Sequence, residues 1–173
     1  FREGRPIADQ VEVSAIPSCV AEAAYATSRP GLLPVEPGPE AMNSPAILAE
    51  LKTALKDWAP GSPAFTVNLS HLPMSAEDHQ VIDKAVGEGA VYIISRGFGN
   101  CRISSTDVRH LWRVQYLNNA PTRLMILNTL VVSGLPEEAM AASEDLEDSV
   151  ARIKELIEWV TQSWELPAVE LQS

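Results

Sequence analysis

The sequence predicts an α+β fold, with a mostly antiparallel sheet of about four to five strands and helices packed on one face. The order of the elements carries this prediction, because a helix, a strand and a helix come before a run of strands and a last helix. A proline-rich stretch precedes them all. We therefore expect an arm or linker over residues 1–43, an α+β domain over 44–166 and a tail over 167–173.

The arm is predicted from its prolines and glycines, which lie close together: Pro30, Gly31, Pro34, Pro37, Gly38 and Pro39. Proline does not fit the interior of a helix or of a central strand. Within the arm, residues 19–25 fit a short helix. The chain starts at Phe1 and not at Met, with no apolar core of a secretory signal, so we expect it to be part of a longer protein.

Two helices and one strand are expected next. Ser44 and Pro45 fit an N-cap and a first helical proline, and apolar residues follow at helical spacing: Ile47, Leu48, Leu51, Leu55 and Trp58. Alternation over Phe65, Val67 and Leu69 predicts a strand with one buried face. Ser75 and Asp78 have the spacing of a capping box. The helix that they begin ends at residues 87–89. Its apolar side is formed by Val81, Ile82, Ala85 and Val86.

The second half of the domain is predicted to be mainly strands. Residues 91–94 and 101–104 flank a glycine turn, which is typical of a hairpin. Residues 110–117 alternate with period two, and 124–132 are apolar on both faces, as in an interior strand. Ser143 is expected to cap the last helix. Its inward side would be formed by five residues: Leu146, Val150, Ile153, Ile157 and Val160.

Composition argues against several classes of protein. With 23 acidic residues against 13 lysines and arginines, the formal net charge is -10, and such a chain repels phosphate backbones and anionic lipid. We expect no nucleic-acid partner. No apolar run is long enough for a membrane-spanning helix, so we expect no membrane insertion. Cys19 and Cys101 are too few for a disulfide framework, which favours a reducing, cytoplasmic location.

An enzyme would need an activated group, and Cys101 is the candidate in this sequence. It follows the glycine turn, and a thiol that met His110 across the hairpin could act as a nucleophile. The sequence shows neither a third group that would orient the histidine nor an oxyanion site. A half-buried structural cysteine is therefore the favoured interpretation. A thiol-dependent redox or enzymatic factor using Cys101 is the alternative.

A metal or cluster carrier is the third hypothesis. His71, His79 and His110 stand apart, without the local spacing of a metal site, so we expect no metal and no other cofactor. Trp58, Trp112 and Trp159 fall at positions that are expected to face a core, and Trp164 lies beyond the last clear helical turn.

The densest charge on the chain is acidic and lies around the start of the last helix: Glu137, Glu138, Glu144, Asp145, Glu147 and Asp148. Acidic residues near a helix N-terminus complement the helix dipole, so a solvated, stabilising helix start is the first explanation. The alternative is a docking surface for basic residues of a partner.

Several segments resemble, in order, the hydrogenase expression/formation family known as HupH or HyaF. They are VNLSHLPMSAED (67–78), GEG (87–89), GFGNCRISST (97–106), WRVQY (112–116), LNTLVV (127–132) and AASEDLEDS (141–149). The resemblance runs from about Phe65 to Val160 and matches the carboxy-terminal module of that family. Some members carry two related modules in tandem, and one clear copy is visible here.

The resemblance implies an accessory protein for maturation of a nickel-iron uptake hydrogenase, not an enzyme. Its expected partner is the precursor of the iron-sulfur small subunit before export, with other maturation accessory proteins as further candidates. The family provides no catalytic residues to carry over. We therefore take two segments as candidate contact regions only. The first segment contains Gly97, Phe98, Gly99, Asn100, Cys101 and Arg102. The second contains Glu144, Asp145, Glu147 and Asp148.

Overall fold

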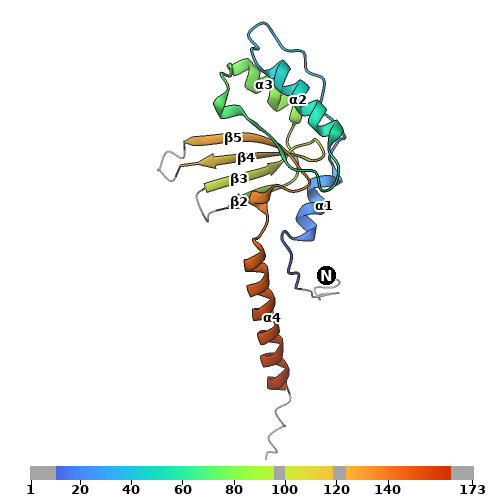
Figure 1. The fold of residues 1–173 in the computed structure, drawn as a ribbon, viewed down its shortest axis with the longest axis vertical. Coiled ribbons are helices and arrows are strands. Elements are labelled where there is room, and N and C mark those ends of the chain that lie inside the picture. Colours follow the sequence, from blue (N-terminus) through green and yellow to red (C-terminus); the bar gives the residue numbers. More distant parts are fainter. Residues whose placement is uncertain (1–10, 96–99, 119–123, 165–173) are drawn as a thin grey trace, which may run out of the picture. The chain divides into compact units, whose positions relative to one another are not determined.

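The computed structural model describes residues 11–95, 100–118 and 124–164, and Figure 1 shows its fold. The chain divides into two compact units, each of which is described by itself. The sheet unit is Ser18–Met140, and the terminal unit combines Phe1–Pro17 with Ala141–Ser173. The helices are α1 (Ser18–Ala26), α2 (Ser44–Asp57), α3 (Ala76–Val86) and α4 (Ser143–Trp164), with short 3-10 helices η1 (Leu69–His71) and η2 (Glu137–Ala139).

The sheet unit contains one antiparallel sheet of five strands in the order β1-β5-β4-β3-β2. The strands are β1 (Phe65–Asn68), β2 (Tyr92–Ser95), β3 (Asn100–Ser105), β4 (Leu111–Leu117) and β5 (Met125–Val132). This architecture confirms the predicted fold class, and it confirms the hairpin of β2 and β3 and the interior position of β5. The turn predicted at 97–100 lies outside the described residues, except for Asn100.

Each face of the sheet supports its own apolar cluster. Side chains alternate along β4, so that Leu111 joins one cluster and Trp112 joins the other. The first cluster contains Ile47 and Leu51 of α2 with Ile82 of α3, so these two helices cover one face of the sheet, as Figure 1 shows. On the opposite face, Ala24 of α1 joins the second cluster. The weakly patterned segment 19–25 is therefore helical, as expected, and contributes to the core.

The start of α3 is fixed by a buried carboxylate. Ser75 and Asp78 form the predicted capping box, in which each side chain accepts a hydrogen bond from the other residue's backbone N–H. The Oδ1 atom of Asp78 also accepts the N–H groups of Met42, Asn43 and Ser44 at 2.8–3.0 Å. Because Asp78 is fully buried, it ties the start of α2 to the start of α3.

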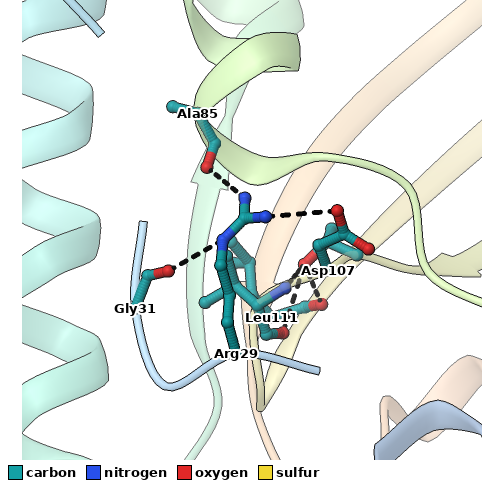
Figure 2. Close-up of polar contacts among 7 residues, drawn as sticks. Arg29, Gly31, Ala85, Asp107 and Leu111 are labelled. Carbon is teal, nitrogen blue, oxygen red and sulfur yellow. Dashed lines mark hydrogen bonds and ion pairs between the residues drawn. The ribbon is translucent and has the colours of Figure 1, made fainter. Parts of the chain in front are cut away.

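The segment between α1 and α2 is extended and held by Arg29. Figure 2 shows its guanidinium donating to the carbonyl oxygens of Ala85 (2.8 Å) and Gly31 (3.1 Å) and pairing with Asp107 at 3.1 Å. The Arg29 backbone also bridges to Val108 in parallel. The proline-rich stretch therefore runs along the end of α3. Arg29 and the N–H of Leu33 both donate to the carbonyl of Ala85, one of the last carbonyls of the helix.

Several local predictions were wrong by small margins. Ser143 was expected to cap the last helix but already lies within α4, because the Ala142 carbonyl accepts the Leu146 N–H. The N-cap of α2 is Asn43, without a side-chain hydrogen bond, and Ser44 is already helical because the first helical hydrogen bond runs from the Ile47 N–H to the Asn43 carbonyl. Leu69 begins η1 and does not extend β1, although it is buried as expected. Phe65 was expected on a buried face but is 40% exposed, since β1 is an edge strand at the rim of the sheet.

Candidate functional site

The first predicted contact region lies at the start of β3. Gly97, Phe98 and Gly99 are outside the described residues, whereas Asn100, Cys101 and Arg102 open the strand. Their registers place them opposite Leu117, Tyr116 and Gln115 of β4, in that order. Asn100 and Arg102 therefore lie on one face of the sheet and Cys101 lies on the other. The three residues do not form one continuous surface.

Cys101 lies among the apolar residues of the second cluster. Only 6% of it is exposed, and burial raises the pKa of its thiol, with a hydrogen bond from Tyr116 acting in the opposite direction. Burial and the adjacent Cys101 raise the pKa of Tyr116 to about 12. A thiol with a raised pKa is largely protonated at neutral pH and is a weak nucleophile.

His110, the expected base for that thiol, lies at the far end of β4. Cys101 pairs with Tyr116 of β4. From Tyr116 back to Leu111, where β4 begins, the strand is roughly 17 Å long. The His110 ring stacks on Trp58, with centroids 3.7 Å apart, and lies 5.2 Å from the ring of Tyr25. Burial, and then the charge of Arg109, lower the pKa of His110. The structure therefore does not bring together the Cys101–His110 pair.

The turn that carries His110 is strained. Its backbone φ is 64°, which is unusual for a residue other than glycine. Three side-chain atoms around it are buried and have no hydrogen-bond partner among the described residues: Nδ1 of His110, Nε1 of Trp58 and Oγ of Ser133. The nearby carbonyl of Gly134 accepts from the Tyr25 hydroxyl and from Trp112 Nε1. The aromatic cluster thus fixes the end of the sheet, and sequence analysis missed it because its members come from four separate segments.

The second predicted contact region begins α4. Glu144 and Asp145 lie in its first turn, with Glu147 and Asp148 in the next, and all four are exposed. None of them forms an ion pair with a residue in the described ranges. The acidic helix start is therefore present as predicted, with its four carboxylates exposed.

The apolar side of α4 is the largest departure from expectation. Five residues were expected to face inward, yet the exposed fractions are 40% for Val150, 60% for Ile157 and 44% for Val160. Leu146 and Ile153 are partly exposed. Trp159 was also predicted to face a core and is 67% exposed. Trp112 is buried and Trp58 is partly buried, as predicted, whereas the side chain of Trp164 is outside the described part.

Within the terminal unit, the segment before α1 contacts the start of α4. Ala141 donates its N–H to the carbonyl of Ala15 at 2.8 Å. Val13, Leu146, Glu147 and Val150 line a hollow of about 320 Å³. Farther along the helix, Leu156, Ile157 and Val160 are exposed, so α4 is an amphipathic helix with an exposed apolar side.

A groove in the sheet unit is a further candidate that sequence analysis did not find. It has a volume of about 770 Å³ and runs between α2 and β1. Its walls are Ala49, Glu50, Thr53, Ala54 and Asp57 of α2, Trp58, Ser62 and Pro63 of the following loop, and Phe65 and Val132 of the sheet. Small residues at 49, 53 and 54, on one side of α2, were the available signal.

Chemistry based on a metal has no visible support in the described ranges. No group of three or more His, Cys, Asp or Glu side chains converges there, and the His71 ring is hydrogen-bonded to Asn68. Over the same part of the chain, no helix combines the length and the apolar character needed to cross a bilayer.

Comparison with known proteins gives a consistent family. Residues 41–160 match the model of the HupH hydrogenase expression protein, C-terminal conserved region. The chain is 46% identical to the hydrogenase expression/formation protein HoxQ of Cupriavidus necator and 43% identical to HupH of Rhodobacter capsulatus. These alignments cover 88% and 87% of this chain but 54% of each relative. The chain therefore spans about half the length of these relatives.

More distant similarities agree. The hydrogenase-1 operon protein HyaF of Escherichia coli is 29% identical over 90% of this chain and 53% of its own length. Among solved structures, the hydrogenase expression protein HupH from Thiobacillus denitrificans aligns with a TM-score of 0.53 at 20% identity. That alignment covers 69% of this chain and 96% of the other. At this identity the likeness shows a shared fold.

Proposed function

We propose, from the premise that this chain belongs to the HupH hydrogenase expression protein family, that it is an accessory protein in the assembly of a nickel-iron hydrogenase. In this proposal it acts by binding another protein and carries out no bond-making chemistry. The relatives are named as hydrogenase expression/formation proteins, which supports the general role. The mode of action is argued from the surface of this chain.

The observation that carries the binding mechanism is the exposed amphipathic side of α4. Leu156 and Ile157 are each about three-fifths exposed, and large apolar side chains gathered on one helix face mark an interaction site. The face spans several turns of a 22-residue helix, which is enough for helix-in-groove recognition. A bound client would remove this apolar surface from water.

The proposed client is the precursor of the iron-sulfur small subunit, held in the cytoplasm before export. An incompletely assembled subunit exposes apolar surface and empty ligand positions, and a folded partner that covers them lowers the population of aggregating forms. The acidic start of α4 would attract a basic segment of that precursor, because opposite charges steer association. Glu144, Asp145, Glu147 and Asp148 are exposed and have no described ion-pair partner, which supports this step.

The thiol-dependent alternative is less well supported by the geometry. Cys101 is buried, the pKa of its thiol is raised, and His110 is engaged with Trp58 at the other end of β4. A Cys101→Ser variant should therefore retain its contribution to hydrogenase maturation. Loss of maturation in that variant, with folding intact by circular dichroism, would favour the thiol hypothesis.

The test of the proposed role is a pull-down of the small-subunit precursor over a salt series. The test variant has Glu144 and Glu147 changed to Gln, with Asp145 and Asp148 changed to Asn. We expect it to bind several-fold less precursor at low salt, with the difference shrinking as salt rises. A matched control changes four exposed acids of the sheet unit to Gln: Glu22, Glu36, Glu40 and Glu88. Absence of precursor in every wild-type pull-down would contradict the role itself, and equal binding of both variants would contradict only the electrostatic step.

A further inference from the structure

The groove between α2 and β1 adjoins an open strand edge. β1 is the terminal strand of the sheet and pairs only with β5 among the described strands. Alternate backbone N–H and C=O groups of Phe65–Asn68 therefore point away from the sheet. In the described part of the chain, no backbone or side-chain group outside the sheet bonds to the backbone of these four residues, apart from the start of η1.

The edge is short, at four residues, but it carries none of the side chains that usually block strand addition. β1 has the sequence FTVN, without a charged residue or a proline, whereas natural edge strands commonly carry lysine, proline or a bulge. Its four residues span about 13 Å. The α2 wall from Ala49 to Asp57 spans about 12 Å. A short extended segment thus matches the length of both walls.

The groove has apolar walls and an acidic rim. Phe65 and Trp58 supply aromatic surface, and Phe65 is 40% exposed. The two charged residues of the lining are Glu50 and Asp57, both exposed on α2. Lys52 of the same helix lines a different hollow with residues 31–35. An occupant with lysine or arginine is therefore favoured over an acidic one.

We propose that this groove docks an extended segment of a partner protein, which adds to the open edge of β1 and carries two apolar side chains flanked by lysine or arginine. Residues i and i+2 of the added strand point to the same face as Phe65 and Val67, toward the groove. Basic residues at i−2 and i+4 lie about 20 Å apart along the added strand, whereas Glu50 and Asp57 lie about 10 Å apart along α2. The long lysine or arginine side chains bridge this difference and bring both charges to the acidic rim. Backbone pairing provides affinity, and the side chains select the sequence.

Two other occupants fit less well. A helix in the groove would leave the outward backbone groups of β1 unpaired. A second copy of the chain, paired edge to edge through β1, would bring two acidic rims together between molecules that each have a net charge of -10. An extended cationic segment satisfies both the backbone edge and the rim.

The probe is the fluorescein-labelled peptide Lys-Thr-Val-Thr-Val-Thr-Lys with blocked ends, titrated against the 173-residue chain by fluorescence polarisation. Its matched partner has Glu at both ends. Two further peptides are N-methylated, one at the odd-numbered and the other at the even-numbered amides. Only one of these two sets of N–H groups faces β1 in the added strand, so only one peptide loses the N–H groups that pair with β1. We expect the lysine peptide to bind at least tenfold more tightly than the glutamate peptide. We also expect only one methylated register to lose binding.

Protein variants locate the site. Phe65→Ala should weaken binding on the order of tenfold, since removal of a central apolar anchor has effects of that size. Glu50→Gln combined with Asp57→Asn should remove most of the salt dependence. The matched controls are Leu33→Ala and Glu36→Gln. Both change exposed residues that lie outside the groove, and both variants should bind the peptide like the wild type.

Several outcomes overturn the proposal. They are equal affinity for the lysine and glutamate peptides, no effect of methylation in either register, or full binding by folded Phe65→Ala. A concentration-dependent dimer that Phe65→Ala abolishes would instead assign the groove to a second copy. The probe contains no hydrogenase sequence. The peptide can therefore fail to bind while the precursor still binds, and the peptide can bind while the precursor does not. The groove and the hydrogenase role are therefore tested separately.

Discussion

Helices α3 and α4 carry similar sequence patterns and end in opposite environments. Both begin with serine and acidic residues and repeat apolar side chains at helical spacing. In α3 these side chains are buried to within a few per cent, whereas Ile157 of α4 is 60% exposed. Helical spacing therefore predicts an apolar side but not what covers it. In α3 the rest of the sheet unit covers that side, and in α4 a large part of it is exposed.

The acidic residues at the two helix starts differ in the same way. Asp78 is fully buried and accepts four backbone N–H groups, from Met42, Asn43, Ser44 and Ser75. Asp148 is exposed and forms no ion pair with a described residue. The first carboxylate stabilises the fold, and the second is available to another molecule.

The largest expected effect comes from removing the buried carboxylate. Asp78→Ala leaves buried N–H groups without acceptors, and we expect it to lower Tm by roughly 10 °C. Asp148→Ala is the matched control and should change Tm by about 1 °C or less. Circular dichroism during heating measures both. Similar small shifts in the two variants would remove the distinction between the helix starts.

Truncating one isoleucine in each helix tests the apolar sides. Ile82→Ala should lower the free energy of unfolding by about 3 kcal/mol, because it leaves a cavity in the first cluster. Ile157→Ala should lower it by less than about 0.5 kcal/mol. Urea denaturation provides both values. An equal loss for Ile157→Ala would mean that the apolar side of α4 is covered in the isolated chain.

Acid should affect stability through Asp78. Burial alone would raise the pKa of this carboxyl, but the hydrogen bonds from Ser44, Ser75 and Asn43 outweigh it and lower the pKa well below its ordinary value. A lowered pKa in the folded state contributes stability above the unfolded pKa of about 4, and that contribution is lost as pH falls below it. Tm measured from pH 6 to pH 3 should fall less steeply in Asp78→Asn than in the wild type. Parallel slopes would contradict this assignment.

The smallest expected effect concerns the serine caps. Ser75→Ala removes the acceptor for the Asp78 N–H and should lower the free energy of unfolding by about 1 kcal/mol. In α4 the first helical acceptor is the carbonyl of Ala142, which takes the Leu146 N–H, so Ser143 already lies within the helix. Ser143→Ala should therefore have an effect of less than about 0.5 kcal/mol by urea denaturation. A larger effect at Ser143 would show that it caps the helix after all.

Local rules were sufficient for much of the sheet unit. The capping box of Ser75 and Asp78, the buried side of α3 and the antiparallel strands follow from spacing and turn residues, and the structure confirms them. The additional acceptor role of Asp78 toward residues 42–44 does not follow, because it depends on two helix starts that meet in space. The same reason hides the His110 cluster and the α2–β1 groove.

The candidate contact regions were harder to predict. An acidic helix start is visible in sequence, and Glu144, Asp145, Glu147 and Asp148 are exposed as a docking surface requires. Whether the turn before β3 binds a partner stays a prediction, since Gly97, Phe98 and Gly99 lie outside the described residues. The exposure of α4 was missed because apolar residues at helical spacing look the same in sequence whether or not the rest of the chain covers them.

The central claim, binding through a preformed surface without thiol chemistry, is tested most directly by titrating purified small-subunit precursor with the purified chain in a calorimeter. The wild type and Cys101→Ser should bind with equal affinity and a one-to-one ratio. A variant with Leu156→Ser and Ile157→Ser should bind at least tenfold more weakly. Loss of binding in Cys101→Ser, with the α4 variant unaffected, would contradict the account.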